Sequence, residues 1–275
     1  MTSRKELKEL IKSRYSEIAM QPAESATGCC TAGCCGDDKT ASKMADSYEF
    51  LEGYEPSADL GLGCGLPTTF AQIKKGDVVI DLGSGAGNDA FIAQHETGET
   101  GKVIGIDFSE AMIERAQSNA RARNVSNVEF MLGDIENLPL ADNIADVVVS
   151  NCVLNLAPDK NAVFAEIYRV LKPGGHFSIS DIVLEEELPQ SLSEATEMHV
   201  GCIAGAVRRD TYLELIRNNK FAKVTIQKEK TISIPGNEWM KDLSKEDIDS
   251  FQNKITSITV YAEKPEGCCS PGCCN

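Results

Sequence analysis

The feature that most constrains the fold is a series of short apolar segments, separated by helical patterns and turns, between residues 77 and 184. Strands that alternate with helices form parallel sheets, because each right-handed crossover returns the chain to the same edge of the sheet. We therefore expect an α/β fold with a doubly wound, mostly parallel sheet. The expected strands are Asp77–Asp81, Lys102–Asp107, Asn127–Leu132, Ala145–Ser150 and His176–Leu184.

Helix start and stop signals lie between these strands. Ser109 is a suitable N-cap for a helix over 110–123. A second helix is expected over 159–171, and Lys172-Pro-Gly-Gly after it reads as a stop signal. These signals support a central α/β domain over residues 66–184.

The segments on either side of this domain have their own patterns. A helix and a cysteine-containing cap are expected over 1–65, a smaller α+β portion over 185–263 and a Cys-rich tail over 264–275. The elements expected there are a helix over 3–19, a short helix beginning at Pro67, helices over 188–206 and 209–219, and strands over 223–234 and 255–263.

Charge and composition exclude some functions. The chain has 275 residues, with 42 acidic against 27 basic side chains and a net charge of −15. Nonspecific nucleic-acid binding depends on Lys and Arg contacts to phosphates, so we expect no nucleic-acid partner. No stretch approaches the roughly 20 apolar residues of a membrane span, and the first residues lack the apolar core of a signal peptide. We expect a cytoplasmic, monomeric protein that does not bind membranes.

A glycine-rich loop, Asp81-Leu-Gly-Ser-Gly-Ala-Gly87, follows the first expected strand and precedes a helix. Glycines there permit tight turns and close approach of a ligand to the backbone. In an open parallel sheet this loop lies at the carboxyl edge, where ligands bind. Asn88 stands where a dinucleotide fingerprint needs its last glycine, and no Gly-Lys-Ser/Thr of a phosphate loop is present. The alternative is a glycine turn that binds nothing.

The D-x-G-x-G-x-G pattern resembles motif I of class I S-adenosylmethionine-dependent methyltransferases. The run Leu171-Lys-Pro-Gly-Gly before the fifth strand also resembles this family. The resemblance implies S-adenosylmethionine as cofactor, with Asp107 at the ribose hydroxyls and Asp134 at the adenine amino group. The residues expected to bind the cofactor are Asp81, Gly83, Ser84, Gly85, Gly87, Asn88, Asp107, Phe108, Met112, Asp134, Ile135, Glu136 and Asn151.

Eight of the 11 cysteines form two CC-xxx-CC clusters, one near each end. Adjacent cysteines make poor disulfides, because their Cα atoms are about 3.8 Å apart, below the usual range of about 4.4–6.8 Å. Reduced thiols that capture a soft metal or metalloid are the preferred interpretation; zinc sites and incidental thiols are the alternatives. These auxiliary candidates are Cys29, Cys30, Cys34, Cys35, Cys268, Cys269, Cys273 and Cys274.

The other three cysteines are single and far apart in the sequence. Cys152 directly follows the fourth strand, at the carboxyl edge beside the glycine loop. Cys202 lies in the helical stretch after the fifth strand, and Cys64 lies in a Gly-rich segment that can fold over the same edge. A buried single cysteine is usually a small apolar side chain. The topology nevertheless predicts that three thiols converge near the cofactor.

The contexts of these cysteines make the resemblance more specific. The segments GLGCGLP, SNCVLNL and HVGCIAGA around Cys64, Cys152 and Cys202 resemble arsenite S-adenosylmethionine methyltransferases over roughly residues 8–263. This resemblance implies an As(III) site of three thiolates and successive methylation with a thiol co-substrate, glutathione or thioredoxin. It also implies that 66–184 binds the cofactor and 185–263 the substrate. The C-terminal CC-xxx-CC cluster departs from the pattern.

The chemistry expected from this resemblance needs no general base, because the arsenic lone pair loses no proton when it attacks a methyl group. Two other functions stay open on the sequence. One is methylation of a small organic substrate such as a quinone, which needs no thiol cluster. The other is a metalloid-binding protein without catalysis, against which the intact glycine loop argues.

Overall fold

The computed structural model describes residues 4–21, 46–187, 201–232 and 254–267. Within them the strands form one seven-stranded sheet in the order β3-β2-β1-β4-β5-β7-β6. Strands β1 to β5 run parallel and β7 is antiparallel to both of its neighbours, which confirms the expected doubly wound, mostly parallel sheet. The strands are β1 (Val78–Leu82), β2 (Lys102–Asp107), β3 (Val128–Leu132), β4 (Ala145–Asn151), β5 (Leu171–Leu184), β6 (Ala222–Ile232) and β7 (Ile255–Glu263).

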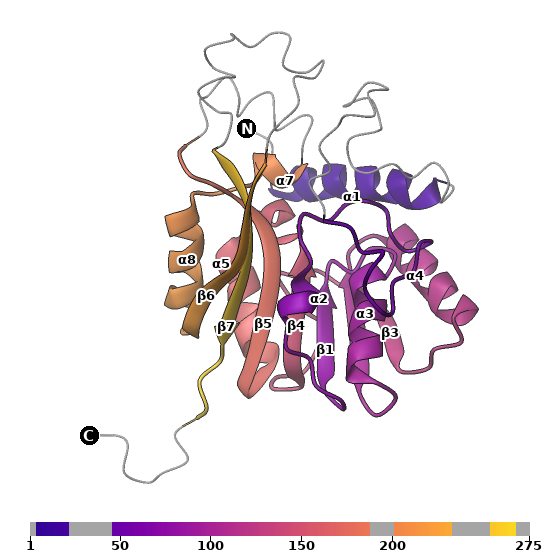
Figure 1. Ribbon diagram of the computed structural model, residues 1–275. Coiled ribbons are helices and arrows are strands. Elements are labelled where there is room, and N and C mark those ends of the chain that lie inside the picture. The colour runs from indigo at the N-terminus through magenta and orange to yellow at the C-terminus, as the bar shows by residue number, and fades with distance from the viewer. Residues whose placement is uncertain (1–3, 22–45, 188–200, 233–253, 268–275) are drawn as a thin grey trace.

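Helices cover both faces of this sheet (Figure 1). Helices α3 and α4 pack on one face, and α5 and α8 pack on the other. The helices are α1 (Arg4–Met20), α2 (Pro67–Phe70), α3 (Asn88–Thr97), α4 (Glu110–Ala122), α5 (Lys160–Val170), α7 (Gly201–Ala204) and α8 (Arg209–Asn218), with a 3₁₀ turn at Leu154–Leu156.

The central strands are apolar along their length because both of their faces are buried. In β1, Val79 packs in the core that contains Phe91 of α3, whereas the next residue, Ile80, packs in the core that contains Phe164 of α5. Successive side chains of a strand point to opposite faces. The apolar run that predicted β1 therefore supplies two cores at once.

Side-chain caps fix the helix starts. The hydroxyl of Ser109 accepts a hydrogen bond from the amide of Met112 at 3.3 Å, so α4 begins where the sequence predicted. The carboxylate of Asp159 accepts one from the amide of Ala162 at 3.1 Å and caps α5. Each cap satisfies an amide that has no partner within its helix.

The start of β5 differs from the prediction. Helix α5 ends at Val170, one residue before the expected end, because β5 begins at Leu171, which pairs with Ala145, instead of at His176. The register shifts beside this pair, and Gly174 has φ +81°. Because glycine tolerates this backbone conformation, the Pro-Gly-Gly run forms a bulge within the strand instead of a separate turn.

Helix α1 lies across the carboxyl edge of the sheet (Figure 1). Polar contacts attach it to α4: Lys12 pairs with Glu110, and the hydroxyls of Ser16 and Ser109 lie 2.9 Å apart. The guanidinium of Arg115 donates to the carbonyl of Ala19 at 2.9 Å. These contacts make α1 a cover over the ends of the parallel strands.

Of the helix expected over 188–206, residues 201–206 fall in the described residues; Gly201–Ala204 are helical, and the helix ends two residues before the expected end. Among the described helices, none has both the length and the apolarity of a membrane span.

Candidate active site

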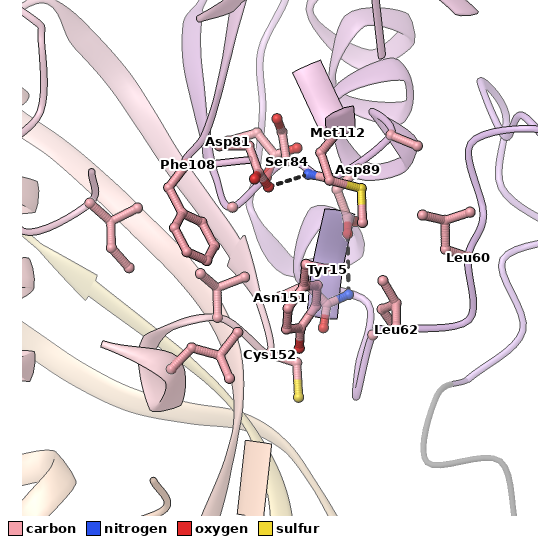
Figure 2. A pocket seen from close by; sticks show the side chains of 18 of the residues that line it. Tyr15, Leu60, Leu62, Asp81, Ser84, Asp89, Phe108, Met112, Asn151 and Cys152 are labelled. Carbon is pink, nitrogen blue, oxygen red and sulfur yellow. Dashed lines mark hydrogen bonds between the residues drawn. The ribbon is translucent and has the colours of Figure 1, made fainter. Parts of the chain in front are cut away.

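A pocket opens at the carboxyl edge of the central strands, and Tyr15 of α1 is among the side chains that line it (Figure 2). The glycine loop, the ends of β2 and β4, a segment over 58–63 and α1 contribute its walls. Most residues expected at the cofactor line it: Asp81, Gly83, Ser84, Gly85, Asn88, Asp107, Phe108, Met112, Asp134, Ile135 and Asn151.

Gly87 and Glu136 do not line the pocket. At Gly87, which has φ +101°, a Cβ atom would lie 2.8 Å from Phe130 Cζ, so this glycine lets α3 approach the sheet. Glu136 accepts a hydrogen bond from the amide of Asp159 at 2.6 Å and pairs with Lys8 of α1. Lys8 also pairs with Asp134 at 2.6 Å, so α1 is tied to the rim of the pocket.

The glycine loop needs glycine at two positions, because the backbone there has positive φ angles and, at Gly83, no space is left for a side chain. At Gly83, φ is +68° and a Cβ atom would lie 2.3 Å from Val153 Cγ2, so no side chain fits. At Gly85, φ is +51°, and its amide donates to Asp107 Oδ2 at 2.9 Å. The loop is therefore folded back from β1 against the end of β2.

Three buried carboxylates surround this loop. Burial raises the pKa of Asp107 to about 6, even though amides of Ser109 and Gly85 donate to it. Burial also raises the pKa of Asp89 to about 6. The pKa of Asp81 is raised well above its usual value, first by burial and then by the charges of Asp89 and Asp107. This concentration of acceptors favours a ligand that brings hydrogen-bond donors.

Several buried polar atoms of the pocket have no partner in the protein. They belong to residues at or just after the glycine loop, and they are Asp81 Oδ2, Ser84 Oγ, Asn88 Oδ1 and Asp89 Oδ1. A buried acceptor without a partner is unfavourable, so these atoms indicate a polar ligand. S-adenosylmethionine, with its ammonium, ribose hydroxyl and adenine amino groups, supplies donors of the required kind.

Three thiols lie beside this pocket. Cys64, Cys152 and Cys202 are free and buried in one cluster, and Cys152 also lines the pocket. The Cys152 thiol is in hydrogen-bonding contact with the other two thiols. The Cys64 and Cys152 sulfurs and a carboxylate oxygen of Asp181 all lie within 4.8 Å of one another. The structure thus brings together the three cysteines that the topology pointed to.

The cysteines are positioned by backbone contacts between distant segments. Cys152 has φ +61°, an uncommon conformation for a residue with a side chain, and its amide donates to Ser180 O at 2.8 Å. The amide of Cys64 donates to Asn151 Oδ1 at 3.0 Å, and its carbonyl accepts from Ser257 Oγ at 2.6 Å. Cys202 Sγ lies 3.2 Å from the carbonyl of Cys152.

Two of the three thiols, Cys64 and Cys152, have a raised pKa in this structure. Hydrogen bonds with Cys202 and Cys64, together with burial, raise the pKa of Cys152 well above its usual value. Burial raises the pKa of Cys64. A ligand that replaces thiol protons by stronger bonds to sulfur fits this cluster.

Sequence reasoning missed three residues of the site. Asp89 follows Asn88 directly, so its place after the glycine loop was the available signal. Tyr48 is buried, and its hydroxyl donates to Asp89 Oδ2 at 2.9 Å, but no motif marks it. Asp181 is buried beside the thiols, where burial raises its pKa to about 7. Its position in an apolar strand was the only sign of a special role.

The eight cysteines of the two CC-xxx-CC clusters lie outside the described residues.

The sheet topology, the glycine loop and the pocket above it define a class I methyltransferase that uses S-adenosylmethionine. The methyltransferase domain family matches residues 73–237. The arsenite methyltransferase of Halobacterium salinarum is 38% identical over 273 residues, which cover 94% of this chain and 67% of that protein. The arsenite methyltransferase of Mus musculus is 32% identical over 214 residues, 74% of this chain and 54% of that protein. This chain belongs to the arsenite methyltransferase family.

A solved structure agrees with this assignment. The arsenic(III) S-adenosylmethionine methyltransferase from Chlamydomonas reinhardtii superposes with a TM-score of 0.63 and 36% identity, over 72% of this chain and 66% of that chain. The present chain therefore spans about two thirds of the Halobacterium and Chlamydomonas proteins and about half of the mouse protein.

Proposed function

We propose that this protein transfers methyl groups from S-adenosylmethionine to As(III) held by Cys64, Cys152 and Cys202. The observation that carries the proposal is the convergence of three buried thiols at the wall of the cofactor pocket, with Cys152 belonging to both. Soft sulfur ligands prefer a soft metalloid to a hard cation. An enzyme for an organic substrate has no use for such a cluster.

The binding step balances without a separate proton acceptor. Arsenous acid exchanges its three hydroxyl groups for three thiolate sulfurs, and each thiol proton leaves with a hydroxide as water. Thiols whose pKa is raised, as for Cys64 and Cys152, are therefore compatible with substrate binding at neutral pH. The three As–S bonds leave arsenic its lone pair, which serves as the nucleophile.

The pocket residues have separate roles in this proposal. When bound, S-adenosylmethionine supplies an electrophilic methyl group carried on a sulfonium sulfur. Asp107 accepts from the ribose hydroxyls and Asp134 from the adenine amino group, while Asp81 and Ser84 offer their unpartnered oxygens to the remaining polar groups. Because Cys152 directly follows Asn151 in the pocket wall, the thiolate site and the methyl donor become neighbours. Catalysis then rests on positioning, which can contribute up to about 7–11 kcal/mol.

A thiol co-substrate completes the proposed cycle. Attack by the arsenic lone pair leaves arsenic pentavalent, so a further methylation needs two electrons to restore the trivalent state. Glutathione or thioredoxin supplies them, with two thiols oxidised to a disulfide. We propose that the protein works as a monomer in the cytoplasm, where thiols are kept reduced. We also propose that residues 185–263 serve the substrate, since Cys202 and Ser257 belong to this portion.

The test is a methylation assay with reduced protein, labelled S-adenosylmethionine, arsenite, and glutathione or thioredoxin. We expect labelled methylarsenicals from the native chain and none from the Cys152→Ser variant, which should still bind the cofactor. The matched control is Ser178→Ala, a buried hydroxyl on β5 that bonds Pro67 O at 2.9 Å and does not line the pocket. Cofactor binding without any arsenic product would overturn the proposal and favour an organic substrate.

A further inference from the structure

The side chain of Asn151 links the cofactor pocket to the thiol cluster. Asn151 is the last residue of β4 and precedes Cys152. Its Oδ1 accepts from the amides of Cys64 at 3.0 Å and Gly65 at 3.3 Å, and its Nδ2 donates to Gly65 O at 2.8 Å. One amide group therefore holds the backbone of Cys64 beside Cys152.

The same amide reaches the cofactor side of the pocket. Asn151 Nδ2 donates to Asp89 Oδ2 at 3.1 Å and contacts the hydroxyl of Tyr48 (Figure 2 shows the link from Asn151 to Asp89 above Cys152). The Tyr48 hydroxyl lies 2.9 Å from Asp89 Oδ2 and 3.1 Å from Gly65 O. Asp89 is the second residue of the helix that follows the glycine loop, it lines the pocket, and its Oδ1 is a buried oxygen without a hydrogen bond. A ligand in the pocket can therefore act on Asp89 through its free oxygen.

The local sequence around Cys64 is suited to this network. A Cβ atom at Gly63 would lie 2.8 Å from Asn151 Nδ2, and one at Gly65 would lie 2.6 Å from Ser180 Oγ. The glycines on both sides of Cys64 thus permit the close approach of Asn151 and β5. Cys64 belongs to no helix or strand, so these side-chain contacts fix its position.

We infer that Asn151, with Asp89 and Tyr48, is a positioning unit that couples cofactor occupancy to the placement of Cys64. A donor group of the cofactor that bonds Asp89 Oδ1 holds this carboxylate in place. The carboxylate then holds the Asn151 amide in place, and the Asn151 amide positions Cys64. Cofactor binding then increases the affinity for As(III), and by linkage As(III) increases the affinity for the cofactor by the same factor. This inference rests on the proposed function and specifies how its two substrates influence each other.

The experiment is a titration of reduced full-length protein with arsenite, followed by the near-ultraviolet absorbance of As–S bonds. It is run with and without saturating S-adenosylhomocysteine, which occupies the pocket but donates no methyl group. The coupling factor is the ratio of the two dissociation constants. We expect a factor of about 10 for the native chain, in the usual range for coupled sites. The reverse titration, S-adenosylhomocysteine with and without arsenite, should give the same factor.

Asn151→Asp tests the link directly. It removes the hydrogens donated to Gly65 O and places a carboxylate against Asp89, so the coupling factor should fall to within about 2-fold of one. Ser257→Ala is the matched control, because Ser257 also holds Cys64 but has no contact with Asp89. This control should weaken arsenite binding in both titrations and keep the coupling factor near its native value. A merely structural role of Asn151 would give the two variants the same behaviour.

Tyr48→Phe provides a second variant if Asn151→Asp does not fold. It keeps the Asn151 amide but removes the hydroxyl that joins Asp89 and Gly65, so the coupling factor should fall to about 3. A native coupling factor of one, its retention in the variants, or its equal loss in Ser257→Ala would overturn the inference. A native chain that methylates arsenite without coupling refutes this inference alone, whereas one that binds no arsenite refutes the proposed function with it.

Discussion

The two walls of the pocket are built in different ways. The carboxylate wall (Asp81, Asp89 and Asp107) comes from two adjacent strand ends and the start of α3, all joined by the glycine loop. The thiol wall (Cys64, Cys152 and Cys202) draws on a cap segment, a strand end and helix α7, which are far apart in the sequence. The first wall is a product of local structure, and the second exists only when distant parts of the chain meet.

The walls also differ in how they store unfavourable energy. In the carboxylate wall it is electrostatic, because burial raises the pKa of each of the three acids. In the thiol wall part of the unfavourable energy is conformational, because Cys152 has φ +61°. The backbone of Cys64 is held there by its amide, which donates to Asn151 Oδ1, and by its carbonyl, which accepts from Ser257 Oγ. Substitutions that remove a charge should therefore change ligand binding at the carboxylate wall. Substitutions that remove a contact should change ligand binding at the thiol wall.

The largest expected effect belongs to the thiol wall. Cys152→Ser removes the sulfur shared by the cluster and the pocket, so arsenite methylation should fall by about 100-fold or more. Affinity for S-adenosylhomocysteine should stay within about 2-fold, since the carboxylate wall is intact. Steady-state methylation and calorimetric cofactor binding measure the two quantities. If the variant also loses affinity for S-adenosylhomocysteine in the absence of arsenite, Cys152 is part of the cofactor site itself.

A substitution in the carboxylate wall should have the opposite pattern, weakening cofactor binding and leaving arsenite binding nearly unchanged. Asp107→Asn removes a charged acceptor from the proposed ribose contact, and its amide group meets backbone donors from Gly85 and Ser109. Cofactor affinity should fall about 10- to 100-fold, the scale of hydrogen bonds to a charged group. Arsenite binding without cofactor should change by less than about 2-fold. An unchanged cofactor affinity would assign the ribose contact to another residue.

The pH dependence of stability should identify the electrostatic cost of Asp107. Its folded pKa of about 6 lies above the value of about 3.9 in an unfolded chain. The folded state therefore holds this proton over a range in which the unfolded state has lost it, and stability decreases as the pH rises from about 4 to about 6. The loss from this group should be about 2 kcal/mol.

Denaturant unfolding of the native chain and of Asp107→Asn at a series of pH values measures this loss. From pH 4 to pH 8, the free energy of unfolding of the native chain should fall relative to that of Asp107→Asn by about 2 kcal/mol. Above pH 8 the difference should stay level. A difference that does not vary with pH would show that Asp107 is ionised equally in both states.

The smallest expected effect concerns the four cysteines near the C-terminal end of the sequence. If Cys268, Cys269, Cys273 and Cys274 gather arsenite for the site, deletion of residues 268–275 should lower turnover about 2- to 5-fold at limiting arsenite, where encounter is rate-determining. Turnover at saturating arsenite should not change. Equal rates at both concentrations would favour a zinc-binding or incidental role. Substitution of the four cysteines by serine is the control for chain length.

The contrast between the walls also explains what the sequence could predict. The glycine loop, the cap at Ser109 and the end of α5 follow from local signals, and the structure contains all three. The position of Cys152 followed from the rule that parallel strands end at one edge, whereas for Cys64 the sequence indicated only a Gly-rich segment that can fold over that edge. Tyr48 and Asp181 were not predictable, because their roles come from hydrogen bonds and burial between distant segments. The early start of β5 was missed because a bulge depends on the partner strand.

The place of β7 in the sheet has a consequence for synthesis on the ribosome. β7 lies between β5 and β6, so the chain inserts a later strand beside one made much earlier. Ser257, which holds the carbonyl of Cys64, is part of that strand. The carboxylate wall uses only residues between 81 and 107, which the ribosome makes long before β7. The thiol wall stays incomplete until residues 255–263 have left the exit tunnel, which delays metalloid capture until the fold that controls it has closed.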